Sequence, residues 1–343
     1  MDRRTAIKTI ATTSIVVTAG CSSLNSCDPS LEGNVVGYTC DAGDGRSVTM
    51  NTDYAFGTDR NGNKLNAWDI TDKSNPTKVD SISLLSPNHS WLESSDDLLF
   101  VTERSGSLAV IDVSDPGRLE VRNTQSVNGW DYTYGVHANA ENVTIVDRDE
   151  NAIALFDVSN PDDITLLDTL SDSIMDTATQ VRIVDGYAYV GASDDSRLVV
   201  VDLSDPNALS IETSIQDSAF DLIDGIEHRG DYLYTTTGEY HSISDTDWNM
   251  SVVDISDPAD PALEATVVDD RLERSFTVRL SGDYAYCSGF NNGNVVVIDI
   301  EDPTDPKQVD YITHESEMHW VDVTDDYGVT IHTNGALQIF KID

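Results

Sequence analysis

The chain has 343 residues and carries 61 Asp and Glu against 20 Lys and Arg, which gives a formal net charge of -41. This charge excludes nucleic acids and anionic membrane surfaces as partners, because both would be repelled. Such acidity can indicate disorder, but the 39% of hydrophobic residues, with 13 Tyr, 7 Phe and 5 Trp, can build a core. We therefore expect a folded protein, and we interpret its acidity as an adaptation to concentrated salt.

Residues 1–20 are predicted to be a twin-arginine-type signal peptide. Arg3 and Arg4 precede an apolar stretch at 10–17 that is too short to span a bilayer. Thr-Ala-Gly at 18–20 and Cys21 then resemble a lipobox, in which the Cys21 thiol receives the lipid, and residues 21–32 form a linker. We therefore expect a protein on the extracellular face of the cell membrane, held there by the lipid anchor only. A plain cleaved signal peptide, with secretion, is the alternative.

Three cysteines follow the lipidation site. Cys27 and Cys40 are close in sequence and are candidates for a disulfide in an exported chain, whereas Cys287 lies in an apolar strand and is predicted to be a buried thiol. The exported chain also offers three sequons, which begin at Asn88, Asn142 and Asn249. Whether they carry glycans is left open.

A repeat fills the rest of the chain. In each unit an apolar run ends in Asp and a turn, at Asp69, Asp112, Asp157, Asp202, Asp254 and Asp299, with Lys341 in the seventh copy. The steps between these residues are 43, 45, 45, 52, 45 and 42. A period near 45 built from short strands predicts a propeller with one four-stranded antiparallel blade per repeat.

A second marker fixes the register within each repeat. An apolar residue stands six positions before the start of the second strand in all seven units, at Val48, Leu92, Val136, Val181, Ile226, Val278 and Val321. Residues 33–343 are therefore predicted to form an all-β, seven-bladed β-propeller that is monomeric. We call its strands A to D from the inside of each blade outward.

The last repeat stops after its third strand. Residues 34–40 are strand-like and stand just before the first A strand. We expect them to pair with residues 337–342, completing the last blade and removing an open sheet edge.

The runs LVVVDLSDP at 198–206 and MSVVDISDP at 250–258 resemble the LVIVD repeat of bacterial and archaeal surface proteins. The resemblance covers residues 45–343 and implies a β-propeller in an extracytoplasmic setting, without a single assigned activity. With the acidity and the lipobox, the chain looks like an exported lipoprotein of haloarchaeal type. The repeated Asp residues are interpreted as turn formers that accept backbone hydrogen bonds, and calcium ligation is the alternative.

The face opposite the Pro-rich C–D turns is where we expect a ligand. Residues near the starts of the A strands should ring the channel mouth there, and the candidates are His89, Trp91, Tyr134, His137, Asp224, Glu227, Arg274 and His319. Imidazole and carboxylate groups together suit a divalent metal, but no pair has metal-ligand spacing within one element, so ordinary polar mouth residues are the alternative. The insertion at 238–249 is a further candidate.

The sequence contains no nucleophile elbow, zinc motif, phosphate loop or haem attachment site. The leading hypothesis is a cell-surface binding or scaffold propeller that recognises a protein or glycan partner. The alternative is a metal-dependent hydrolase or oxidoreductase whose site lies at the central channel mouth.

Overall fold

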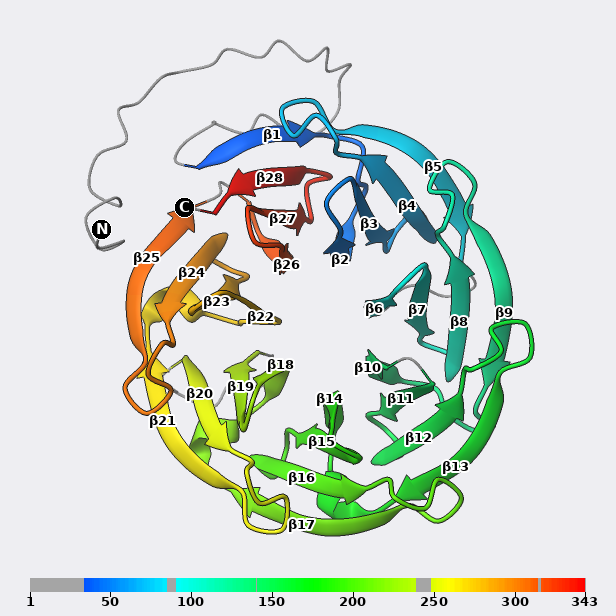
Figure 1. Cartoon of the computed structure of the whole chain (residues 1–343), viewed down its shortest axis with the longest axis vertical. Helices are drawn as coiled ribbons and strands as arrows, with labels where there is room; N and C mark the ends of the chain where they lie inside the picture. Colours follow the sequence, from blue (N-terminus) through cyan, green and yellow to red (C-terminus); the bar gives the residue numbers. More distant parts are fainter. Residues whose placement is uncertain (1–33, 85–90, 140, 239–247, 314–315, 343) are drawn as a thin grey trace.

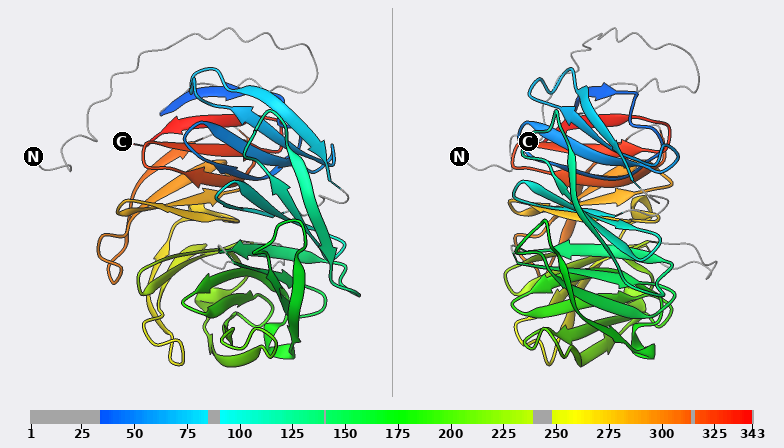
Figure 2. Two further views of the ribbon diagram at one scale, coloured as in Figure 1. Left: turned by 45° about the vertical axis from the view of Figure 1, so that its right-hand side comes forward. Right: turned by 90° about the vertical axis from the view of Figure 1, so that its right-hand side faces the viewer.

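The protein is a ring of seven four-stranded antiparallel sheets, as seen in a computed structural model that describes residues 34–84, 91–139, 141–238, 248–313 and 316–342 (Figure 1). The A strands surround the central axis and the D strands form the rim. Edge-on, the ring is a thick disc (Figure 2). The predicted seven-bladed architecture is confirmed.

The first four blades follow one another along the chain, each in the order A to D. Blade 1 contains β2 (Gly45–Met50), β3 (Tyr54–Asp59), β4 (Lys64–Asp69) and β5 (Thr77–Ser83). Blade 2 contains β6 (Leu92–Ser95), β7 (Leu98–Glu103), β8 (Ser107–Asp112) and β9 (Glu120–Ser126). Blade 3 contains β10 (Thr133–Ala138), β11 (Asn142–Asp147), β12 (Ala152–Asp157) and β13 (Thr165–Ser171). Blade 4 contains β14 (Ala178–Val184), β15 (Tyr187–Ala192), β16 (Arg197–Asp202) and β17 (Ser210–Gln216).

The remaining blades continue this order until the ring closes. Blade 5 contains β18 (Ile223–Arg229), β19 (Tyr232–Thr237), β20 (Asn249–Asp254) and β21 (Ala262–Val268). Blade 6 contains β22 (Val278–Ser281), β23 (Tyr284–Gly289), β24 (Asn294–Asp299) and β25 (Lys307–Thr313). Blade 7 contains β26 (Met318–Val323), β27 (Tyr327–His332), β28 (Leu337–Lys341) and, as its outer strand, β1 (Val35–Thr39).

The N-terminal strand closes the ring as predicted. Strand β1 pairs antiparallel with β28, with Val35 opposite Phe340 and Thr39 opposite Leu337. The two ends of the chain therefore share one sheet, and the last blade presents no unpaired inner strand.

The C strands are buried on both faces because neighbouring blades cover them. In β16, Val199, Val200 and Val201 have no exposed surface. Alternating polar and apolar residues would leave one face in water, so the unbroken apolar runs of the repeat are explained by blade stacking.

The repeated Asp residues hold the C–D turns together. In each of the six blades that keep it, the Asp at the end of strand C accepts a hydrogen bond from the backbone N–H two residues on, as in Asp112 Oδ1 with Ser114 N at 2.9 Å and Asp202 Oδ1 with Ser204 N at 2.7 Å. Hydrogen bonds from Ser114 also hold the pKa of Asp112 below its usual value. These turns match the architectural interpretation.

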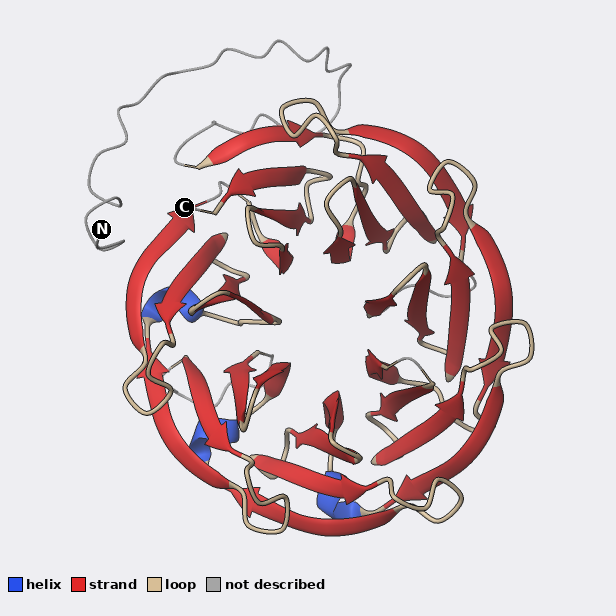
Figure 3. Ribbon diagram, viewed as in Figure 1, coloured by secondary structure: helices blue, strands red, loops and turns tan. Residues whose placement is uncertain are grey.

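The described D–A connections contain three single-turn 3-10 helices that were not predicted (Figure 3). They are η3 (Ser173–Met175), η4 (Ser218–Phe220) and η5 (Asp270–Leu272), and the Asp before each one accepts a hydrogen bond from its second backbone N–H. Each turn buries one larger apolar side chain, at Met175, Phe220 and Leu272. In the described part of the chain, no helix has the length and apolar character needed to cross a membrane.

The structure describes some of the cysteines and sequons. Cys287 is a free thiol with no exposed surface, as predicted, and burial raises its pKa. Cys40 is disulfide-bonded, while its candidate partner Cys27, together with Cys21 and Asn88, lies outside the described residues. Asn142 is partly buried at the start of β11, and Asn249 is 5% exposed and accepts a hydrogen bond from Ser251. The Asn249 sequon is therefore inaccessible in the folded protein.

Candidate functional site

A ring of polar side chains surrounds the central axis at one repeat position. The residue that follows the apolar marker of each A strand is polar in all seven blades, and together these residues are Thr49, Glu93, His137, Arg182, Glu227, Arg279 and Asp322. We call this set the axial ring. The A strands are innermost (Figure 1), so the fold brings these seven equivalent positions together around the axis.

Arg279 connects the three carboxylates of the axial ring. Its guanidinium nitrogens lie 3.6 Å from Glu93 Oε2, 3.6 Å from Glu227 Oε2 and 3.3 Å from Asp322 Oδ1. All four side chains are at most 17% exposed. A cation placed among buried carboxylates offsets part of the cost of removing them from water.

Arg182 reinforces the same network from blade 4. It pairs with Glu227 and lies 3.5 Å from Glu93 Oε1. Two guanidinium groups therefore hold two of the carboxylates from different directions. Such a planar, multiply bonded arrangement fixes the carboxylate orientations more firmly than a single point charge would.

Backbone and neutral groups complete the ring. Asp322 Oδ2 accepts hydrogen bonds from Thr49 Oγ1 at 2.9 Å and from the Met50 N–H at 2.8 Å. His137 Nδ1 accepts from the Ile183 N–H at 3.0 Å, and burial holds the pKa of His137 well below its usual value, so this imidazole is neutral.

Burial governs the protonation of the ring carboxyls. It raises the pKa of Glu93, and Arg279 and Arg182 act against that rise. Burial likewise raises the pKa of Asp322, opposed first by Arg279. The arginines are therefore what allows these carboxylates to remain charged inside the protein.

A pocket of about 460 Å³ opens beside the axial ring. Its walls come from the C-terminal ends of the A strands and from the A–B turns, and include Thr49, Glu93, Ser94, Glu227, His228, Arg279 and Asp322. Met50, Leu280 and Val323 add an apolar margin. This axial pocket lies on the face that carries the Pro-rich C–D turns, opposite the face on which the sequence predicted a ligand.

The structure divides the predicted mouth residues into two groups. His137 and Glu227 belong to the axial ring. The starts of the A strands, on the opposite face, hold Trp91, Tyr134, Asp224, Arg274 and His319. His89 lies outside the described residues. Their part in ligand binding stays a prediction.

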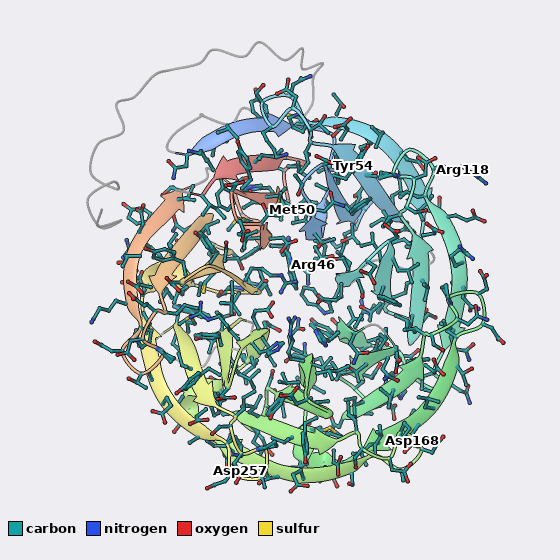
Figure 4. All side chains as sticks on the ribbon, viewed as in Figure 1. Arg46, Met50, Tyr54, Arg118, Asp168 and Asp257 are labelled. Atoms are coloured by element: carbon teal, nitrogen blue, oxygen red, sulfur yellow. The ribbon has the colours of Figure 1, made fainter. Side chains whose placement is uncertain are left out.

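His319 is already engaged on both ring nitrogens. Its Nε2 lies 2.7 Å from Arg46 Nη1 and its Nδ1 lies 2.9 Å from the Gly45 carbonyl oxygen. Because guanidinium only donates, Nδ1 carries the proton and Nε2 accepts. Burial, followed by Arg46, lowers the pKa of His319 well below its usual value. Arg46 itself lies near the axis of the ring (Figure 4).

Aromatic side chains fill the channel next to this histidine. The Trp91 ring centroid lies 4.9 Å from that of Trp320 and 5.5 Å from that of Tyr134. Phe290 lies 4.5 Å from the His319 ring, and the Arg274 guanidinium lies 4.6 Å from the Phe290 ring. The starts of the A strands thus form a packed aromatic and cationic layer.

Sequence reasoning missed Thr49, Glu93, Arg182, Arg279 and Asp322. The repeat alignment held the signal, because each of them follows a marker residue directly. Among the described side chains, no three His, Cys, Asp or Glu gather in a way that suits a metal ion.

The LVIVD repeat pattern matches residues 42–83, 93–122, 177–217, 226–269 and 275–312. The chain belongs to the LVIVD-repeat family. The matched segments cover more than half of the sequence. They leave out blade 3, in which Asn160 replaces the second Asp of the motif, and blade 7, in which Lys341 replaces the first. A comparison with curated proteins finds no match.

Solved structures share the fold of this LVIVD-repeat protein at low sequence identity. The β-propeller domain of Cps50 (Swd1) from Myceliophteria thermophila is 16% identical with a TM-score of 0.70, covering 90% of this chain and 99% of that one. A functionally unknown protein from Desulfotomaculum acetoxidans is 12% identical with a TM-score of 0.69, covering 84% and 92%. A putative 6-phosphogluconolactonase from Bacteroides uniformis is 10% identical with a TM-score of 0.64, covering 78% and 84%. These likenesses concern the fold alone.

Proposed function

We propose that this protein is an exported, lipid-anchored binding propeller that recognises a protein or glycan partner at the cell surface through the axial pocket. The observation that carries the proposal is a pocket of about 460 Å³ beside a ring of ion-paired side chains. A volume of this order accommodates a sugar residue or the tip of a peptide loop.

The chemistry of the pocket favours binding of a polar group. Glu93, Glu227 and Asp322 are held by arginines, so their orientations are set before a ligand arrives. Oxygen lone pairs that the arginines do not use can accept hydrogen bonds from ligand hydroxyl or amide groups. A site that is ordered in advance loses less conformational entropy on binding.

Photo-crosslinking on intact cells tests the axial pocket. A photoreactive side chain at Ser94, which lines the pocket, should give a discrete adduct whose mass identifies it as peptide or glycan. Ser210, an exposed residue at the start of outer strand β17, provides the matched control position. No adduct at Ser94, or the same adducts at both positions, would remove the basis for this site. The purified native protein, added in excess, should compete with the protein on the cells for the crosslinked partner. Purified Ser94→Trp, in which the new side chain fills the pocket entrance, should not compete, whereas purified Ser210→Trp should.

Membrane attachment is tested separately at Cys21. We expect Cys21→Ser to release the protein from the membrane fraction into the medium with an unchanged melting temperature, because the thiol carries the lipid while the described fold begins at residue 34. Cys287→Ser, which alters a buried thiol far along the chain, is the control. Full membrane retention of the Cys21 variant contradicts the lipoprotein proposal.

A further inference from the structure

We propose that Arg104 and Arg148 form a second binding site, which takes the carboxylate of a uronic acid residue in a glycan. The two arginines stand in the B–C turns of neighbouring blades 2 and 3. These turns lie on the face opposite the axial pocket, so the site is independent of the proposed axial site.

The two guanidinium groups flank one tyrosine. Arg104 Cζ lies 4.1 Å from the centroid of the Tyr132 ring, and Arg148 Cζ lies 5.8 Å from it. Both distances are within the range of a cation–π contact. Tyr132 also stacks on Tyr134 at 5.4 Å, and Tyr134 hydrogen-bonds to Arg148. The contacts hold both arginines near one place without using up their donors.

Neither arginine forms a direct ion pair with a carboxylate of the described chain, although Asp224 acts on Arg148 from a longer range and helps to raise its pKa. Other arginines of this acidic protein form close pairs, such as Arg60 with Asp44 at 2.6 Å and Arg122 with Asp162 at 2.7 Å. Among the described residues, no carboxylate oxygen lies within 4 Å of Arg104 or Arg148. With three acids for every base in the sequence, such an adjacent pair of available guanidinium groups is a departure from the rest of the molecule.

The acid that precedes Arg148 is committed to the backbone. Asp147 Oδ2 accepts hydrogen bonds from the Tyr132 N–H at 3.0 Å and from Thr133 Oγ1 at 3.3 Å. Its Oδ1 accepts from the backbone N–H groups of Asp149 and Glu150, each at 3.1 Å. Asp147 therefore shapes the turn that presents Arg148 and leaves the guanidinium to an external anion.

A uronate matches the features that the site combines. The guanidinium fork pairs bidentately with a carboxylate. Arg104 and Tyr134 stack on the Tyr132 ring, but Tyr132 is only partly buried, so the exposed edge of the ring offers an apolar contact for the C–H groups of a pyranose beside the two charges. An acidic peptide offers the carboxylate on a flexible stem, whereas a pyranose adds a rigid apolar C–H surface next to it, so the uronate fits the combination of charge and aromatic ring better.

Calorimetry on the folded full chain tests this site with a galacturonate trisaccharide as the probe. We expect the galacturonate to bind and its carboxyl-reduced, uncharged counterpart to bind at least about tenfold more weakly, because the charge-assisted hydrogen bonds are lost. The double substitution Arg104→Gln with Arg148→Gln should weaken galacturonate binding by at least the same factor. Arg104→Lys should lie in between, since lysine keeps the charge but lacks the fork.

The matched control is Arg118→Gln, which removes a guanidinium that is 80% exposed in a C–D turn on the other face. It should leave galacturonate binding unchanged, and Ser94→Trp in the axial pocket should do so too. Thermal unfolding of each variant verifies that it is folded. The proposal is overturned if the native chain does not bind galacturonate, if it binds a triglutamate peptide better, or if Arg118→Gln weakens binding as much as the double substitution.

Discussion

Replacing Arg279 with methionine should lower the free energy of unfolding by about 3–5 kcal/mol, because the change leaves buried carboxylates without their shared cation. Glu93, Glu227 and Asp322 all lie within 3.6 Å of this guanidinium, and all are at most 17% exposed. Chemical denaturation at constant salt measures the loss. Arg118→Met, at an exposed arginine, is the control and should change stability by less than about 0.5 kcal/mol.

The stability lost in the Arg279→Met variant should grow as the pH rises. Burial raises the pKa of Glu93 and Asp322, so these carboxyls favour the folded state below their unfolded pKa, and this contribution is lost as pH rises through the folded pKa. Without Arg279 the pKa of both carboxyls rises further, because only Arg182 still opposes the rise at Glu93 and only hydrogen bonds oppose it at Asp322. The difference between the variant and the native protein should therefore be largest near about pH 7 and shrink toward about pH 5, where protonation neutralises the carboxyls. A difference that grows on acidification would show that the axial ring is not the cause.

Much of the fold could be predicted from the sequence, because each blade repeats the same local requirements. The marker residues fell in A strands, every B strand begins at the position six residues after its marker, and the C strands end at the repeated Asp or at Lys341. Apolar runs without alternation required two covered faces, which stacked blades provide. The missing strand of the last repeat left residues 34–40 as its only strand-like complement.

The candidate site was predicted only in part. At two of the predicted mouth residues, β-bulges set the side-chain direction in a way that the sequence did not indicate. Ladder pairing skips His319 in β26 and Asp224 in β18, so the side-chain direction at these two positions does not follow simple strand alternation. His319 contacts Arg46 and the Gly45 carbonyl of the neighbouring blade, and its part in ligand binding stays a prediction. A bulge of this kind has no marker in the sequence of a single strand.

The axial ring was missed for a different reason. Its members differ in charge and size from blade to blade, so no single repeat shows a motif. Only closure of the ring brings Glu93 of blade 2 to Arg182 of blade 4 and Arg279 of blade 6. The chemistry of the site thus depends on contacts across the channel, which local patterns do not contain.

Deleting residues 22–40 should destabilise the ring by about 3–5 kcal/mol, whereas deleting residues 22–33 should cost much less. Only the longer deletion removes β1, with its ladder to β28 and the hydrogen bond from the Lys341 N–H to the Asn34 carbonyl at 2.9 Å. Its loss exposes the edge of β28 and removes the partly buried side chains of Val35, Val36 and Tyr38, which exposes the apolar surface that they cover. Melting temperatures of the two variants in the same salt make the comparison.

The longer deletion removes Cys40 and both deletions remove its candidate partner Cys27, so two full-length variants separate the strand from the disulfide. Cys40→Ser breaks the disulfide and keeps β1, so it should cost less than the deletion if pairing is what closes the ring. Gly37→Val keeps the disulfide but places a Cβ 2.0 Å from the carbonyl oxygen of Lys73 in blade 1, which forces β1 away from that turn. We expect Gly37→Val to approach the effect of the long deletion, because β1 then loses contact with the first blade while the cysteines remain. If Cys40→Ser accounts for the whole loss and Gly37→Val has no effect, the disulfide closes the ring and the strand does not.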